Sequence, residues 1–426
     1  MEGLYWVGFI VFLASIVFSW RAVTSISVGL MIMVGAGERI FISRNPEVSG
    51  ATPKHRGGFH RVGWFILAAF IYSIIQVLMT LVVDSSTLPQ LQTKAGILAI
   101  PLAVYLSNFI NRERGPLLFH ALAILLIIAF LYCLTVAGIN FNGGNSEFFY
   151  HDLVSPINGH AVYISIYTFT TLVFLMEAIL QRKWVVPKNV HALLAVVLVI
   201  FLVLLASKLV IAFFCLYLLY FIYSLFRNHR RRKQFAFILL LLAIANGFLL
   251  FSTENPVKER FSDLKGKFEI RDKNDPSEYL NGLQFRLLQW KIVPEILSEK
   301  DKWLTGVGIS NSQSELNRKY IARNLYQGDG KEDRGYLHYN SHNQFLQDLM
   351  QTGLPGLLGF VFLCIVLVLL CTSRRSAMVL LTISLILVYA IVESLLETQY
   401  GIVIFCFFPL LAYLSVTNKL SKKKSP

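Results

Sequence analysis

The sequence has few charged residues for its length. Asp, Glu, Lys and Arg make up 15% of the 426 residues, whereas apolar residues make up 55% and the mean hydropathy is +0.58. Soluble domains carry about a quarter charged residues, and they cannot bury this much apolar surface. The composition therefore excludes a compact soluble enzyme and a disordered chain, and it predicts a membrane protein.

Cysteine is also scarce. All five cysteines fall within apolar segments and none lies in the large polar region, which favours ordinary buried thiols over a disulfide framework or a metal site. They are Cys133, Cys215, Cys364, Cys371 and Cys406. The first apolar run has no basic leader and no small-residue cleavage site, so we do not expect a cleavable signal peptide.

Nucleotide-binding motifs are missing from the sequence. It contains no glycine-rich loop of the Walker type and no dinucleotide fingerprint. No Asp-rich pair suggests a metal-dependent glycosyltransferase centre. We therefore expect neither a nucleotide, a metal nor another cofactor.

Long apolar runs dominate the sequence. A helix needs about 20 apolar residues to cross the hydrocarbon core of a bilayer. Twelve runs approach this length, at 3–20, 24–42, 62–83, 95–110, 117–138, 162–180, 190–206, 209–226, 234–252, 353–372, 376–392 and 400–417. The predicted fold class is an all-α polytopic membrane protein with about twelve transmembrane helices. The stretch 190–226 is predicted to turn at Ser207-Lys208.

Basic residues are distributed unevenly along these runs. The formal net charge is +14, and with both termini in the cytoplasm the inner loops contain 20 Lys and Arg. The short outer loops then contain only Arg21, Lys94 and Lys208. This bias follows the positive-inside rule, so we expect both termini to be cytoplasmic.

One large region, residues 253–352, is polar and is predicted to lie outside the membrane. It holds 15 Lys and Arg and 15 Asp and Glu, so its net charge is zero. The spacing of apolar residues predicts a helix over 279–297 that Pro294 kinks or ends. The glycines of 303–308 predict a turn. A further helix is expected to start at Ser341, with Ser341 or Asn343 as its cap.

The predicted organisation has three parts. Residues 1–252 form a membrane bundle of about nine helices, and 253–352 form a periplasmic catalytic loop. Residues 353–426 add about three membrane helices and a basic cytoplasmic tail. A polar loop of a hundred residues with its own helices is too long for a simple connector, although an inert extramembrane domain is the alternative.

Two histidines, His338 and His342, lie four residues apart in this loop. On a continuous helix they would share a face, as metal ligands sometimes do. No Glu in the metalloprotease pattern and no cysteine accompanies them, which disfavours a metal. His342 suits a general base or a substrate-orienting group, and the alternative is a surface histidine beside a helix cap.

Several cations are candidates for binding an anionic substrate. Arg286 lies within an apolar helix pattern and could bind phosphate oxygens, or it could simply face water. Lys208 lies between two apolar segments, where a charge lines a cavity or extends to the lipid headgroups. Arg260 and Arg334 are further candidates in the polar loop.

Three local patterns resemble the O-antigen ligase/polymerase superfamily of bacterial envelope glycosyltransferases. The patterns are Ala206-Ser-Lys-Leu-Val210, then Arg286-Leu-Leu-Gln-Trp290 with Trp303-Leu-Thr-Gly-Val-Gly308, and Ser341-His-Asn-Gln-Phe-Leu346 with Thr352-Gly-Leu-Pro-Gly356. The similarity covers roughly residues 200–370. The remaining membrane segments match only as generic membrane helices.

The resemblance implies a reaction and a set of site residues. Members of this family move a glycan from undecaprenyl diphosphate to an acceptor hydroxyl on the periplasmic side, without nucleotide or metal. His342 would activate the acceptor and Arg286 would contact the donor diphosphate, with Lys208, Arg260, Arg334 and His338 as further donor contacts. Relatives usually have arginine at the position of Lys208, and lysine keeps the charge but loses bidentate geometry.

The favoured interpretation is a ligase of the bacterial inner membrane that joins the glycan to a lipid A–core sugar with inversion. The implied partners are the undecaprenyl-diphosphate-linked glycan, the lipid A–core or a growing glycan as acceptor, and membrane lipids, with no nucleic acid.

Other functions remain open. An O-antigen or exopolysaccharide polymerase tends to have a second large outer loop. Here the stretch 139–161 contains His151, Asp152 and His160 but no Lys or Arg. A protein oligosaccharyltransferase is disfavoured because only two short apolar runs follow residue 372. A transporter or flippase would place polar groups at the membrane midplane, where this sequence has few charges. A structural scaffold is the remaining alternative.

Overall fold

The computed structural model describes residues 2–44, 56–141, 146–181, 186–227, 271–277, 280–329, 333, 335–372 and 376–416. Within these ranges the chain is helical and has no strand. The elements of the first half are α1 (Glu2–Val17), α2 (Arg21–Arg44), α3 (Arg56–Asp84), η2 (Ser85–Ala95), α4 (Gly96–Ser107), α5 (Arg114–Ile139), η3 (Ser146–Phe148), α6 (Tyr150–Val154), η4 (Ser155–Ile157), α7 (Ala161–Gln181), α8 (Lys188–Leu204) and α9 (Lys208–Arg227). Those of the second half are α12 (Gly282–Glu299), α13 (Ile309–Ala322), α14 (Gln344–Thr372), α15 (Ala377–Val392), η7 (Leu395–Glu397) and α16 (Gln399–Ser415).

Six stretches within the described residues are long and apolar enough to cross a membrane. They are Arg21–Phe41, Arg61–Ser107, Arg114–Ile139, Ala161–Gln181, Lys208–Arg227 and Gln344–Leu370. Four shorter apolar helices, α1, α8, α15 and α16, accompany them. The predicted run 234–252 lies outside the described residues, and each of the other predicted runs coincides with a helix. The all-helical membrane class is confirmed, whereas the number of twelve spans stays a prediction.

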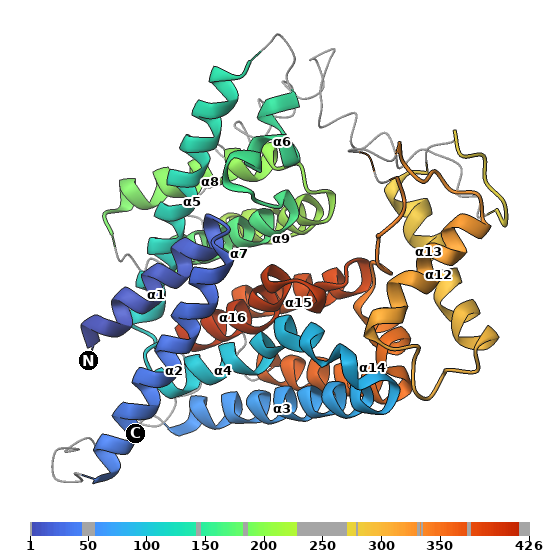
Figure 1. Cartoon of the computed structure of the whole chain (residues 1–426). Helices are drawn as coiled ribbons and strands as arrows, with labels where there is room; N and C mark the ends of the chain where they lie inside the picture. Colours follow the sequence, from blue (N-terminus) through green and yellow to red (C-terminus); the bar gives the residue numbers. More distant parts are fainter. Residues whose placement is uncertain are drawn as a thin grey trace.

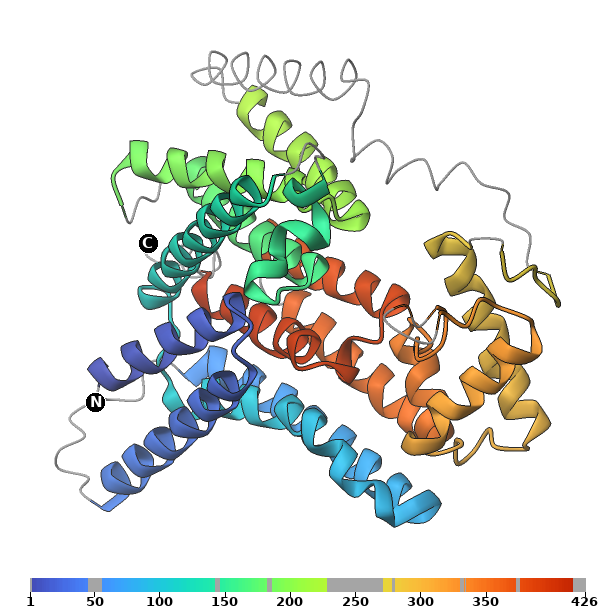
Figure 2. The ribbon, with the colours of Figure 1, turned by 45° about the horizontal axis from the view of Figure 1, so that its top comes forward.

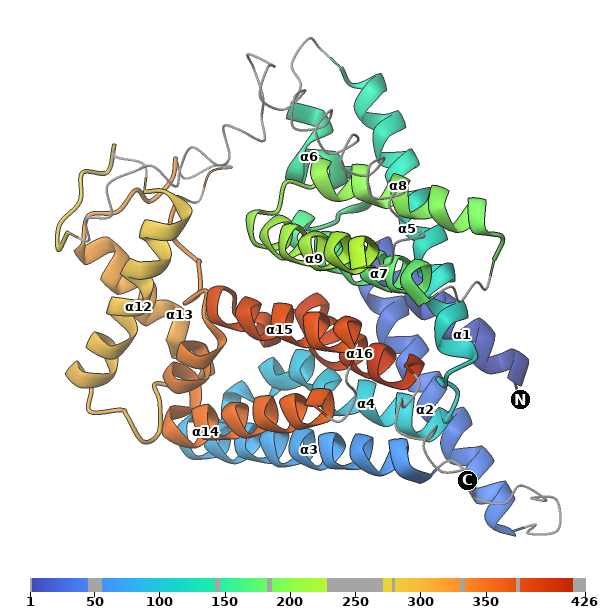
Figure 3. The same cartoon turned by 180° about the vertical axis from the view of Figure 1, so that it is seen from behind.

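The helices form a bundle with a smaller helical unit at one end. α14 packs along α3, and α12 and α13 lie together beyond the start of α14 (Figure 1). We call the described residues between 271 and 343 the cap. Figure 2 shows α15 and α16 running through the middle of the molecule toward the cap. The start of α1 lies at the opposite end of the bundle, as the view from behind also shows (Figure 3).

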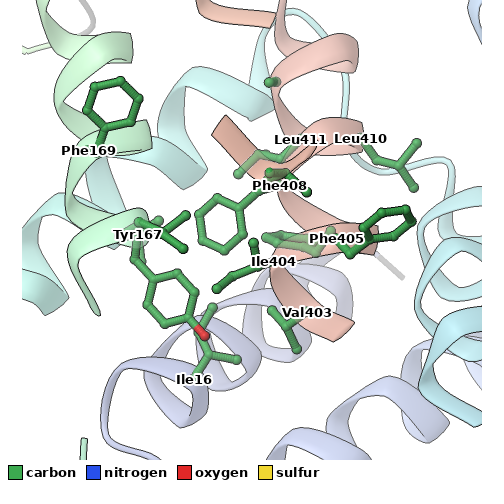
Figure 4. Close-up of a cluster of buried hydrophobic side chains, with 14 of the residues drawn as sticks. Ile16, Tyr167, Phe169, Val403, Ile404, Phe405, Phe408, Leu410 and Leu411 are labelled. Atoms are coloured by element: carbon green, nitrogen blue, oxygen red, sulfur yellow. The ribbon is translucent and has the colours of Figure 1, made fainter. Parts of the chain in front are cut away.

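The centre of the bundle is built around α7 and α16. Both helices are buried along most of their length, and the rings of Tyr167 and Phe408 stack at 5.0 Å (Figure 4). Large apolar side chains on other helices are exposed, among them Leu131 and Leu219. In lipid these exposed residues carry no penalty, so the bundle is stabilised chiefly by close packing rather than by removal of apolar surface from water.

The cap has its own small core around α12. Asn281 and Gln284 form a capping box at the start of this helix, and its buried face packs on Leu316 and Tyr320. The predicted helix is confirmed. Pro294 was expected to kink or end this helix, and it does not end it, because α12 continues to Glu299. Ile292 and Ile296, both fully buried, hold the helix on either side of the proline.

A turn of the cap joins the cap to a break in α14. Gly353 has a φ of +66° and interrupts the helical backbone. At this point Leu354 N–H donates to Trp303 O at 2.9 Å, and Val307 N–H donates to Met350 O at 2.8 Å. A Cβ on Gly353 would lie 2.3 Å from Leu304 O. The predicted turn over 303–308 is therefore confirmed. These hydrogen bonds hold it against the α14 backbone around Gly353.

The α8–α9 junction forms the predicted turn. Ala206 has a φ of +45° between the two helices, and the hydroxyls of Ser207 and Tyr389 lie 2.9 Å apart. This contact brings the first residue of α9, Lys208, to the last turn of α15.

Candidate functional site

The histidine pair lies in an irregular segment between the cap and α14. His338 and His342 have φ values of +70° and +42°, so they do not share the face of a helix as a continuous helix would require. His338 is exposed, and its backbone N–H donates to Asn317 Oδ1 at 3.0 Å. Within the described part of the chain, no group of three or more His, Cys, Asp or Glu is placed to hold a metal ion.

The start of α14 fixes the position of His342. Asn343 Oδ1 accepts from Leu346 N–H at 3.1 Å, which is the bond of a helix cap. Ser341 Oγ donates to Asn343 O at 3.0 Å and to Gln347 Oε1 at 2.8 Å. The predicted helix start is confirmed, with Asn343 as the cap. His342 is thereby held at the end of a rigid helix.

The tautomer of His342 follows from its neighbour Asn340. His342 Nδ1 lies 3.2 Å from Asn340 O, and because a carbonyl only accepts, Nδ1 must carry the proton. Burial lowers the pKa of His342 below its ordinary value; Glu393 raises this pKa and Arg286 lowers it. A neutral ring with its proton on Nδ1 leaves the Nε2 lone pair available, as a general base requires.

Arg286 connects the cap to the end of α15. Its Nε donates to Val392 O at 2.9 Å, and its Nη1 donates to Gly282 O at 3.0 Å. Its Nη2 lies 2.8 Å from Glu393 Oε1. A guanidinium has five N–H groups, so these bonds between described residues leave two for an anionic ligand. The side chain remains 28% exposed, which makes that approach possible.

Glu393 was not among the residues predicted from sequence. It binds Arg286 and influences the pKa of His342, so it lies between the two predicted site residues. The next residue, Ser394, accepts from Asn343 N–H at 3.3 Å through its hydroxyl. The only signal in the sequence was a carboxylate directly after the apolar run 376–392, and a charge at the end of a membrane helix is too common to mark a site.

The remaining candidate site residues are Lys208, His338, Arg260 and Arg334. Lys208 is half-buried at the start of α9 and follows Ser207, whose hydroxyl lies 2.9 Å from that of Tyr389 in the last turn of α15. His338 lies on the exposed side of the cap. Arg260 and Arg334 lie outside the described residues. The structure thus brings His342 and Arg286 together and places the start of α9 beside Tyr389 of α15.

A cavity of about 900 Å³ opens beside this site. Asn340 and Glu393 line it where it meets the His342 segment, and Arg21, His160 and Tyr400 line other parts of its wall. Glu397 also lines the cavity, and it contacts a buried polar network. Lys94 Nζ is 2.9 Å from Glu397 Oε1 and donates to Gln351 Oε1 at 2.7 Å. Sequence analysis had used Lys94 and Arg21 only to orient the chain.

Comparison with known proteins gives a match to a protein family. Residues 193–361 match the family model described as O-antigen ligase, a stretch that includes Lys208, Arg286 and His342. No curated protein matches the chain. The match confirms the resemblance noted from sequence and indicates a glycosyltransferase-like role in O-antigen processing with lipid-linked glycan substrates. Together with the apolar helices, it fits a multi-pass membrane protein.

Proposed function

We propose that this chain, whose residues 193–361 match the O-antigen ligase family model, transfers a glycan from undecaprenyl diphosphate to an acceptor hydroxyl, in the form of O-antigen ligation to a lipid A–core sugar. The observation that carries the proposal is the geometry of His342. Its Nδ1 is committed to Asn340 O, and its Nε2 is left to accept a proton next to the guanidinium of Arg286.

The reaction needs a base and a stabilised leaving group. The acceptor oxygen attacks the anomeric carbon while its proton passes to His342 Nε2, and the bond from that carbon to the diphosphate oxygen breaks. The two remaining N–H groups of Arg286, with Lys208, stabilise the charge on the departing undecaprenyl diphosphate. Base and leaving group act on opposite faces of the sugar, so the anomeric configuration inverts.

Glu393 supports this chemistry by positioning Arg286. Its carboxylate and Val392 O together fix the plane of the guanidinium, so little rotamer freedom is lost when the diphosphate binds. The carboxylate also raises the pKa of His342, which makes the ring a stronger base than its buried environment alone would allow.

The location follows from the distribution of charge. We place the chain in the bacterial inner membrane with both termini in the cytoplasm and the cap in the periplasm. In this arrangement residues 1–252 are the N-terminal bundle, 253–352 carry the catalytic loop, and 353–426 complete the membrane part. The cap and the start of α1 lie at opposite ends of the bundle (Figure 1), which supports this orientation.

The test is a reconstituted transfer assay. Vesicles containing the full chain receive an undecaprenyl-diphosphate glycan and a lipid A–core acceptor, and products are resolved by mass and by anomeric configuration. Wild type should give one added glycan block with inverted configuration, and His342→Ala should lose transfer by about a hundredfold or more. Lys302→Ala, an exposed cap residue, is the matched control and should retain wild-type activity.

Each other outcome has a distinct meaning. Transfer at wild-type rate by a folded His342→Ala variant would refute the role of His342. Lengthening of lipid-linked chains would show a polymerase instead of a ligase. Movement of the lipid-linked glycan across the vesicle membrane with no new glycosidic bond would show a flippase.

A further inference from the structure

The 900 Å³ cavity is distinct in chemistry from the surroundings of Arg286. It extends from Asn340 and Glu393 to α2, the start of α4, the 158–163 segment and the start of α16. Its volume lies at the upper end of the range for ligand pockets, so it could hold several sugar rings. Neither Arg286 nor Lys208 lines it.

The charges of the wall do not suit a diphosphate. Among the lining residues the carboxylates are Glu393 and Glu397, and the lining cation is Arg21. Desolvation together with the nearby His151 and His342 lowers the pKa of His160 to about 4, so this lining histidine is uncharged at neutral pH. Arg286 and Lys94 already neutralise Glu393 and Glu397, so the wall offers the two charges of a diphosphate only Arg21. An uncharged ligand needs no such counter-charge.

The wall instead carries the groups that bind carbohydrate. Three aromatic rings line it in sequence, with centroid distances of 4.7 Å from His160 to Tyr163 and 5.7 Å from Tyr163 to Tyr400. Tyr163 is 7% exposed between the other two rings, so contact with the C–H faces of pyranose rings falls to His160 and Tyr400, which flank it. Sugar hydroxyls are bound by amide, hydroxyl and carboxylate side chains, and the wall supplies these as Gln92, Asn158, Thr398 and Glu397.

The wall is fixed by contacts between distant parts of the chain. Gln399 Nε2 donates to Arg21 O at 3.0 Å and to Ser25 Oγ at 2.9 Å. Thr398 Oγ1 donates to Tyr163 OH at 3.1 Å, and Arg21 lies 5.3 Å from the ring centre of Tyr400. A wall held in this way is organised before the ligand arrives, which reduces the entropy cost of binding.

Building on the proposed transfer reaction, we propose that this cavity is the acceptor subsite, which binds uncharged hexose units of the acceptor glycan against His160, Tyr163 and Tyr400. The acceptor then approaches His342 from the cavity side, across Asn340. The donor diphosphate remains on the Arg286 side of Glu393. Glu393 thus lies on the boundary between the two substrates.

Two probes separate this subsite from the donor site. Full-length protein in lipid nanodiscs is titrated with a neutral hexose oligosaccharide from the outer part of a lipopolysaccharide core, and separately with inorganic pyrophosphate. Tyr400→Ala should weaken oligosaccharide binding by about tenfold, the effect expected from loss of one aromatic stacking contact. Pyrophosphate binding should be unchanged in this variant and weakened in Arg286→Gln.

Further variants guard against misfolding and non-specific effects. His160→Ala removes a second ring of the cavity wall and should weaken oligosaccharide binding in the same direction. Tyr132→Ala removes an exposed tyrosine of α5 that does not line the cavity, and it should bind both probes as wild type does. Wild-type oligosaccharide binding by both Tyr400→Ala and His160→Ala would overturn the proposal. It would also be overturned if these two variants lost pyrophosphate binding while the Tyr132→Ala control kept it.

The transfer assay distinguishes failure of the subsite from failure of the function. If transfer proceeds but the acceptor KM is unchanged in Tyr400→Ala, the subsite is wrong and the function stands. If the oligosaccharide binds and Tyr400→Ala abolishes that binding, while no lipid-diphosphate glycan is transferred, the subsite stands and the proposed reaction is wrong.

Discussion

At the scale of single residues, the protonation of His342 makes a prediction about pH. The ring acts as a base only when neutral, so kcat/KM for transfer should rise with pH through the His342 pKa and then reach a plateau. Because burial places this pKa below its ordinary value, the plateau should already hold at neutral pH. Glu393 raises the pKa, so Glu393→Gln should move the acidic limb to lower pH.

The measurement is the pH profile of kcat/KM for wild type, Glu393→Gln and the Lys302→Ala control. The control should keep the wild-type profile, since Lys302 lies on the exposed side of the cap. An acidic limb of Glu393→Gln that coincides with wild type, or that moves to higher pH, would contradict the assignment of that limb to His342.

Lys208 makes a second prediction at this scale. In the proposed reaction, an ammonium at the start of α9 supplies charge to the donor diphosphate but not the paired N–H groups of a guanidinium. Lys208→Arg should therefore keep most of the transfer activity, and Lys208→Ala should lose more than tenfold, about the value of one charge-assisted contact. The rates are measured with saturating acceptor and varied donor. Equal rates in all three proteins would leave only an interaction with lipid headgroups for this lysine.

At the scale of elements, the contact between the 303–308 turn and α14 depends on glycine. A side chain at 353 would have to adopt a φ of +66° and place its Cβ 2.3 Å from Leu304 O. We expect Gly353→Ala to lower the free energy of unfolding by about 1–3 kcal/mol, detected as a lower Tm in detergent. Gly63→Ala in α3 is the control, because a Cβ there meets nothing within 4 Å. Equal Tm values would contradict the contact.

The buried lysine of η2 makes a further prediction about how elements are joined. Lys94 is 6% exposed and pairs with Glu397 of η7 at 2.9 Å and with Asp348 of α14 at 3.9 Å. Lys94→Met leaves the buried carboxylate of Asp348 and the partly buried one of Glu397 without their cation, which should cost roughly 3–5 kcal/mol. Adding Asp348→Asn removes one of these charges and should restore part of the Tm. A double variant no more stable than Lys94→Met would refute the pairing.

At the scale of the whole molecule, the helices were predictable and most of their contacts were not. Apolar runs such as 117–138 and 162–180 coincide with α5 and α7, because a backbone in lipid must satisfy its hydrogen bonds within a helix. The sequence could not show that α7 is buried on nearly all sides while α5 exposes residues such as Leu131. The buried helix α7 is the less apolar of the two, so the apolarity of a run does not show whether its helix is buried in the bundle or faces lipid.

The site was predictable to the extent that its residues carry local patterns. His342 and Arg286 lie in recognisable motifs, whereas Glu393 and Tyr400 contact partners more than a hundred residues away in sequence. The cations assigned to the short outer loops prove informative in a different way. Arg21 lines the cavity, Lys94 is buried beneath it, and Lys208 begins the helix beside Tyr389. From sequence, the small number of basic residues in these loops indicated the orientation of the chain in the membrane. In the structure, all three lie near the candidate site.

The orientation itself can be tested with two lysines at opposite ends of the bundle. Lys302 is exposed on the cap, and Lys188 is exposed at the start of α8. That end of α8 lies near the end of α16, since His191 contacts His120 of α5 and a Cβ on Gly115 of α5 would contact Ser415. With Cys215 replaced by alanine, Lys302→Cys should react with a membrane-impermeant maleimide in intact spheroplasts. Lys188→Cys should react only after permeabilisation, and the reverse pattern would show that the positive-inside assignment is wrong.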